Sequence, residues 1–92
     1  MDELQSLREQ IDRLDAALVY VLGQRFACTE KIGRIKKDRG LPGYDEQRET
    51  SQKERLFHLA ADAGLAPGVM KKIFETVTAA VRERHDQIRH EK

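Results

Sequence analysis

The sequence predicts an all-α fold with three helices per chain, one very long N-terminal helix and two shorter ones. Apolar residues recur in steps of three and four along three segments, which is the spacing of one helix face. Charged residues make up 36% of the chain, and only two prolines interrupt it. This composition suits long helices with solvated faces, and no strand-like alternation competes with the helical pattern.

The first helix is predicted from about Asp2 to Asp38. Its apolar stripe is formed by Leu4, Leu7, Ile11, Leu14, Leu18, Val21, Cys28, Ile32 and Ile35. About 35 residues make a helix roughly 50 Å long, whereas a compact chain of this size has a radius of gyration of about 12 Å. Two shorter helices cannot cover so long a stripe. We therefore expect a second copy of the chain to cover it, in an intertwined homodimer.

A turn and a cap predict the second helix. Residues 39–45, RGLPGYD, contain two glycines and a proline, which end the first helix and turn the chain. Asp45 is suited to cap the next helix, and Glu46 and Glu49 favour the positive end of its dipole. That helix stops near Gly64, and its apolar side carries Leu56, Leu59, Ala60 and Ala63.

The third helix begins after the turn GLAPG, because Pro67 is suited to a first helical position. The apolar pattern of this helix ends at Ile88, and charged residues follow. Its apolar face is predicted to consist of Val69, Met70, Ile73, Phe74, Val77, Val81 and Ile88.

Composition excludes several classes of protein. At 92 residues the chain is one domain, residues 1–92, and its net charge of +1 with mixed signs argues against a polyanion binder. Cys28 is the only cysteine, so neither an intrachain disulfide nor a paired-cysteine zinc site is possible. We find no secretion signal and no apolar run of about 20 residues. A soluble, cytoplasmic protein is expected.

Two cations of the first helix face the groove that its stripe forms. Arg25 interrupts the apolar stripe, and a buried charge without a partner is very costly, so Arg25 must face an anion. That anion is either a protein carboxylate such as Glu49, in a structural ion pair, or a ligand. Lys36 follows at about 20° around the helix and about 16 Å along it. It either leans into the same groove or is an ordinary solvated lysine.

The other two helices also carry polar groups on inward faces. Glu49 lies on the face of Leu56, beside Arg48, and His85 continues the apolar stripe of the third helix. His58 and His90 are assigned to the surface. Together these positions predict a shared polar cavity that receives negative charge. It has no serine–histidine–acid set, no phosphate loop and no two-histidine metal spacing, since His85 and His90 are five residues apart.

The segments LREQIDRLD, QR at 24–25, IGRIK at 32–36 and YDEQRE at 44–49 resemble the all-helical, AroQ-type class of chorismate mutase. The resemblance runs from about Leu4 to Ile88. It implies an isomerase that rearranges chorismate to prephenate, on the way to phenylalanine and tyrosine, without a metal or cofactor. It also implies an intertwined dimer with two sites between the helices.

The resemblance assigns roles to eight residues. Arg8 would arrive from the partner chain and bind a substrate carboxylate, while Arg25 would grip a carboxylate within its own chain. Lys36 would donate to the ether oxygen of the breaking bond. The ring hydroxyl and the local charge network would be held by Asp45, Arg48 and Glu49. The last two positions, on the third helix, are Val81 and His85.

These two positions depart from the family pattern. The family commonly has a glutamine where this chain has His85, and often a small polar residue where it has Val81. We predict that His85 is the second donor to the ether oxygen, with activity that depends on pH near about 6.5, where histidines ordinarily titrate. Val81 removes one hydrogen bond and makes the wall of the pocket drier.

Other functions fit the same sequence. Relatives with this fold act on isochorismate as a pyruvate lyase, or on the amino analogue of chorismate. A helical dimer that only scaffolds or regulates would use the charges as structural ion pairs. Nucleic-acid binding, suggested by GRIKKDRG, is disfavoured by Asp38, the many other acidic residues and the small net charge.

Overall fold

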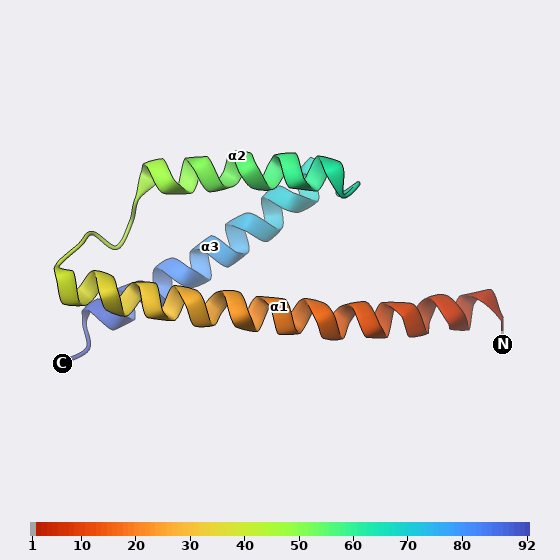
Figure 1. Ribbon diagram of the computed structural model, residues 1–92, viewed down its shortest axis with the longest axis horizontal. Coiled ribbons are helices and arrows are strands. Elements are labelled where there is room, and N and C mark those ends of the chain that lie inside the picture. Colours follow the sequence, from red (N-terminus) through yellow and green to blue (C-terminus); the bar gives the residue numbers. More distant parts are fainter. Residues whose placement is uncertain (1) are drawn as a thin grey trace.

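The protein folds into three helices that agree with the predicted all-α class. The computed structural model describes residues 2–92, which form α1 (Glu3–Arg39), α2 (Glu46–Asp62), α3 (Pro67–Arg89) and no strand. In Figure 1, α3 runs obliquely between the other two helices and packs on both, whereas α1 and α2 have no packing contact of their own. None of the three helices is long and apolar enough to cross a membrane.

Caps fix the helix ends close to where the sequence places them. Asp2 lies just outside α1, and its carboxylate accepts a hydrogen bond of 2.8 Å from the backbone N–H of Gln5. Gly40 ends α1 with a φ of 65°, a left-handed conformation that glycine adopts without strain. Asp45 caps α2 as predicted, since its carboxylate accepts from the backbone N–H of Arg48 at 3.0 Å.

A glycine sets the crossing of α1 and α3. Gly33 is the only buried residue of α1, and it lies against His85 and Ile88 of α3. Ile88 is fully buried, and His85 is buried beside it. The His85 ring donates a hydrogen bond from Nε2 to the backbone carbonyl of Thr29, over 2.7 Å, because a carbonyl can only accept. The closest contact of α1 with α3 therefore combines close packing with one buried hydrogen bond.

Ion pairs hold the C-terminal end of α3 against α1. Arg84 donates to Glu30 at 2.6 Å, and Arg34 donates to Glu91 at 2.8 Å. The backbone carbonyl of Glu91 also accepts from Lys37 at 2.6 Å. The hydrogen bond from Arg84 lowers the pKa of Glu30, and that from Arg34 lowers the pKa of Glu91. These side chains are between one third and one half exposed, so solvent weakens the pairs and they orient the helix end more than they stabilise it.

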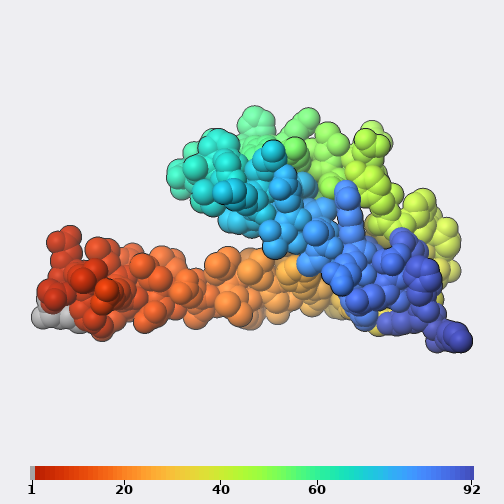
Figure 2. Space-filling view, turned by 180° about the vertical axis from the view of Figure 1, so that it is seen from behind, coloured from red at the N-terminus to blue at the C-terminus, as the bar shows by residue number. Residues whose placement is uncertain are grey.

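The N-terminal half of α1 projects beyond the other helices as an arm. Figures 1 and 2 show this arm extending away from α2 and α3, in a molecule measuring 57 × 27 × 15 Å. Eight large apolar side chains on it are 50–68% exposed: Leu4, Leu7, Ile11, Leu14, Leu18, Val19, Tyr20 and Val21. The expectation that one chain cannot cover its own stripe is confirmed. The homodimer itself stays a prediction.

The crossing leads to a stability prediction. A Cβ at residue 33 would lie 2.7 Å from Cδ2 of His85 and 2.9 Å from Cδ1 of Ile88, closer than packed carbon atoms allow. Because both neighbours are buried, Gly33→Ala should lower the free energy of unfolding by about 1–3 kcal/mol. Urea denaturation followed by circular dichroism measures this change.

Gly23→Ala is the matched control on the same helix. A Cβ at Gly23 meets nothing within 4 Å, so alanine there should leave stability unchanged or raise it by up to about 1 kcal/mol through helix propensity. Equal stability of the two variants would contradict the proposed role of Gly33 in the crossing.

Candidate active site

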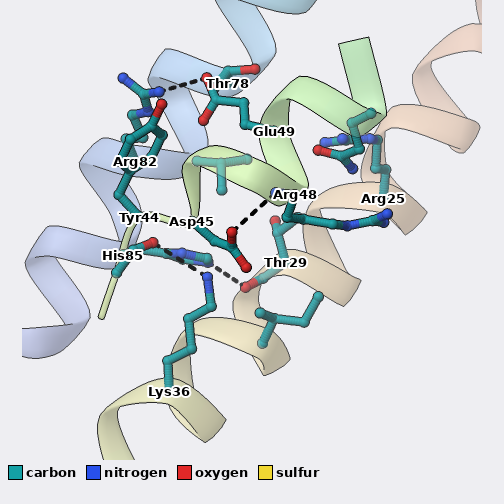
Figure 3. Close-up of a pocket in the computed structure, with 14 residues that line it drawn as sticks. Arg25, Thr29, Lys36, Tyr44, Asp45, Arg48, Glu49, Thr78, Arg82 and His85 are labelled. Atoms are coloured by element: carbon teal, nitrogen blue, oxygen red, sulfur yellow. Dashed lines mark hydrogen bonds and ion pairs between the residues drawn. The ribbon is translucent and has the colours of Figure 1, made fainter. Parts of the chain in front are cut away.

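A groove lies where the C-terminal half of α1, the start of α2 and the middle of α3 meet. Its volume is about 230 Å³, and Figure 3 shows its side chains converging from all three helices and from the loop before α2. The residues that line it are Arg25, Thr29, Ile32, Lys36, Gly43, Tyr44, Asp45, Arg48, Glu49, Gln52, Thr78, Val81, Arg82 and His85.

The groove contains seven of the eight residues that the sequence pointed to. These are Arg25, Lys36, Asp45, Arg48, Glu49, Val81 and His85. The eighth, Arg8, lies on the exposed arm of α1, about 25 Å along the helix from Arg25. Within one chain it does not reach the groove, as its position in the sequence requires.

Three cations of the groove form no ion pair among residues 2–92. Arg25 is half-buried, yet it is paired with no carboxylate, and the same holds for Arg48 at the exposed rim. Lys36 donates only to the backbone carbonyl of Gly43, at 3.3 Å. Such cations attract an anion, so the charge of this groove suits a small anionic ligand.

The two carboxylates of the groove are already engaged. Asp45 caps α2, and Glu49 accepts a hydrogen bond of 2.5 Å from Nη2 of Arg82. The structural ion pair considered between Glu49 and Arg25 is therefore wrong, because Arg82 of α3 takes that place. As a result, Arg25 keeps its charge available to a ligand.

Sequence reasoning missed Arg82. Its guanidinium carbon lies 4.1 Å from the centroid of the Tyr44 ring, so it stacks on the loop before α2 while it binds Glu49. The hydrogen bond that Arg82 donates to Glu49 raises the pKa of Arg82. A signal was present, since Thr78, Arg82 and His85 are spaced four and three residues apart and thus share a helix face.

His85 is placed in the groove with one ring nitrogen already used. Nε2 donates to the Thr29 carbonyl, and the exposed fraction of the residue is 6%. A neutral imidazole carries a single N–H, so its Nδ1 can then only accept. Donation from Nδ1 to another group requires the protonated ring.

The lining residues suit binding and electrostatic stabilisation rather than covalent chemistry. Neither serine nor cysteine lines the groove, and Cys28 is exposed outside it. Apolar side chains, Ile32 and Val81, share the lining with the cations. The groove can hold a small anion in one orientation and place positive charge beside particular oxygens.

Known proteins resemble this chain along most of its length. It is 39% identical over 74 residues to a 3-dehydroquinate dehydratase of Pyrobaculum aerophilum, covering 80% of this chain and 21% of that protein. It is 30% identical to a 4-amino-4-deoxychorismate mutase of Streptomyces venezuelae, covering 83% and 74% of the two chains. Identity to a chorismate mutase of Methanocaldococcus jannaschii is 24%, covering 82% and 76%.

The first of these relatives is much longer than this chain, which spans about a fifth of its length. The model of one family, chorismate mutase type II, matches residues 7–86. That stretch includes all of α2, most of α1 and α3, and every residue that lines the groove. The chain belongs to the chorismate mutase type II family.

Proposed function

We propose that the protein is a chorismate mutase, an isomerase that rearranges chorismate to prephenate for the synthesis of phenylalanine and tyrosine in the cytoplasm. The observation that carries this proposal is the set of three cations, Arg25, Lys36 and Arg48, that line one groove without a carboxylate partner among the described residues. Chorismate is a dianion, so it would supply the missing charges. Family membership supports the same assignment.

The proposed reaction needs only what this groove offers. A [3,3] rearrangement uses no nucleophile and transfers no proton, so the enzyme accelerates it by holding a flexible dianion in its reactive shape. Arg25 binds one carboxylate through its planar fork, and Lys36 directs its ammonium at the ether oxygen. Negative charge grows on that oxygen as the carbon–oxygen bond lengthens, and a fixed cation there lowers the barrier.

The ring of the substrate would face the start of α2. Asp45 caps α2, Arg48 and Glu49 lie on its first turn, and all three line the groove. In our proposal they bind the ring hydroxyl and balance the local charge. Val81 and Ile32 contribute an apolar wall against the ring.

A second chain would complete the site. The exposed apolar stripe on the arm of α1 supports a homodimer, because a stripe of this size is an ordinary feature of an interface. In the proposed dimer, Arg8 of one chain enters the groove of its partner and binds the second carboxylate. The long α1 thereby contributes to both sites.

The amino analogue of chorismate is the second candidate substrate. The relative in Streptomyces venezuelae that bears the name 4-amino-4-deoxychorismate mutase matches 83% of this chain. The two substrates differ in the ring substituent, which the start of α2 would contact. Isochorismate, as the substrate of a pyruvate lyase, is the third.

Purified protein should consume chorismate, seen as loss of its diene absorbance, and release prephenate with no added metal or cofactor. Release of pyruvate from isochorismate would instead identify a lyase. If none of the three substrates reacts while the protein remains a helical dimer, a scaffold role replaces the proposed one. Sedimentation and circular dichroism provide that control.

Arg25→Ala should reduce turnover below detection and leave the dimer folded, because it removes a charge that binds the substrate. Arg8→Ala should do the same. Mixing the two inactive proteins after unfolding and refolding should restore about a quarter of the wild-type activity, since half of the dimers are mixed and each has one intact site. No recovery on mixing would contradict the exchange of Arg8 between chains, and collapse of Arg25→Ala would indicate a structural role.

With His85 as a donor to the ether oxygen, turnover should be higher in acidic than in neutral solution. Because Nε2 donates to Thr29, only the protonated ring has an N–H at Nδ1 for the ether oxygen. His85→Gln is the matched variant, since its amide donates without titrating, and its pH profile should be flat between about pH 5 and 8. A flat wild-type profile together with full activity of His85→Ala would remove His85 from the reaction.

A further inference from the structure

We propose that Arg82 determines which ring substituent the site accepts, and that it favours a neutral hydroxyl over a charged amine. This inference rests on the proposed function and concerns the same groove. It assigns a specificity role to a residue that lies next to Val81 on α3 and binds Glu49.

Arg82 links three parts of the groove. Nη2 of Arg82 donates to Oε1 of Glu49 over 2.5 Å, from α3 to α2, and the guanidinium stacks on the Tyr44 ring of the connecting loop. Figure 3 shows Arg82 reaching across to Glu49 on the side of the groove opposite Arg25. The Glu49 side chain is 24% exposed and that of Arg82 50%, so the carboxylate is the more enclosed partner.

The ion pair leaves one half of the carboxylate free. Among the described residues, Oε2 of Glu49 has no hydrogen-bond partner, and Glu49 has no other cation. Oε2 can therefore accept a hydrogen bond from a ring hydroxyl while Oε1 stays with Arg82. A neutral hydroxyl adds no charge to a pair that is already balanced.

A ring amine would meet a different environment. Aliphatic amines are protonated at neutral pH, so the amino analogue brings a positive charge to a carboxylate that Arg82 already neutralises. Two cations would then share one carboxylate, and their repulsion in a partly enclosed groove disfavours the amine. The ion pair of Arg82 and Glu49 thus selects against a positively charged ring substituent.

Without Arg82 the preference between the hydroxyl and the amine should reverse. Glu49 would become an unpaired carboxylate beside the substituent, which attracts an ammonium group. It would also repel chorismate, whose charge is entirely negative. Both effects shift preference in the same direction, toward the amino analogue.

A purely structural role makes a different prediction. If the ion pair only tethers α2 to α3, its loss should lower kcat/KM for both substrates by the same factor. The ratio of the two kcat/KM values is therefore the readout that separates the two roles.

The test measures kcat/KM for chorismate and for 4-amino-4-deoxychorismate in the wild type and three variants. Arg82→Met should raise the ratio of kcat/KM for 4-amino-4-deoxychorismate to kcat/KM for chorismate by at least about tenfold. Arg82→Lys keeps the charge, so its ratio should stay within about twofold of the wild type. Arg55→Met is the matched control, because Arg55 is an exposed residue of α2 outside the groove and has no ion pair within residues 2–92. Its ratio should not change.

The outcomes distinguish this inference from the proposed function. An unchanged ratio in Arg82→Met, with chorismate still consumed, would overturn the inference and leave the function intact. Arg82→Gln provides the same comparison if the methionine variant does not fold. A wild type that prefers the amine would also overturn it, and a wild type that converts neither substrate would overturn both proposals.

Discussion

The half-buried guanidinium of Arg25 needs a counter-charge, and the arrangement of the groove depends on this requirement. Arg25 lies in an apolar stripe where a neutral side chain would pack more favourably, and among the described residues no carboxylate pairs with it. Lys36, which is half-buried, and Arg48, which is exposed, also lack a carboxylate partner among the described residues. A fold optimised for stability alone would pair these charges or replace them. Their arrangement is intelligible as a site whose counter-charge is a ligand, and the proposed substrate has the two carboxylates that this requires.

The scaffold must hold these like charges close together, and it does so with few contacts. Gly33 allows His85 and Ile88 to approach α1, which fixes α3 relative to the half of α1 that carries Arg25 and Lys36. The Asp45 cap fixes the first turn of α2, so Arg48 and Glu49 enter the groove in a defined direction. Because α1 and α2 do not pack on each other, α3 is the helix that relates them, together with the loop that joins them. The groove thus depends on α3 for its shape as well as for part of its lining.

Helical periodicity was sufficient to predict the elements. The polar residues on inward faces, together with the family resemblance, predicted seven of the fourteen residues that line the groove. The Asp45 cap and the inward direction of Arg25 follow from local rules, which require no knowledge of how the helices cross. The partner of Glu49 was predicted incorrectly because Arg82 is 33 residues away, and their contact depends on the placement of α2 against α3. Likewise, the bond from His85 to the Thr29 carbonyl spans 56 residues. A stripe defines which face a residue occupies, but its partner is decided by tertiary packing.

The two halves of α1 have different surroundings, and the need for both halves explains the length of the helix. The first part of α1 has large apolar side chains in solvent, whereas the part beyond Arg25 packs on α3 and contributes cations to the groove. In the proposed dimer, the apolar part would be buried by the second chain, and the hydrophobic effect would drive that association. Arg8 lies within this apolar part, so the contact that buries the stripe would also carry a guanidinium into the other chain's groove. Assembly and completion of the site would then be one event, since neither could occur without the same pairing of α1 helices.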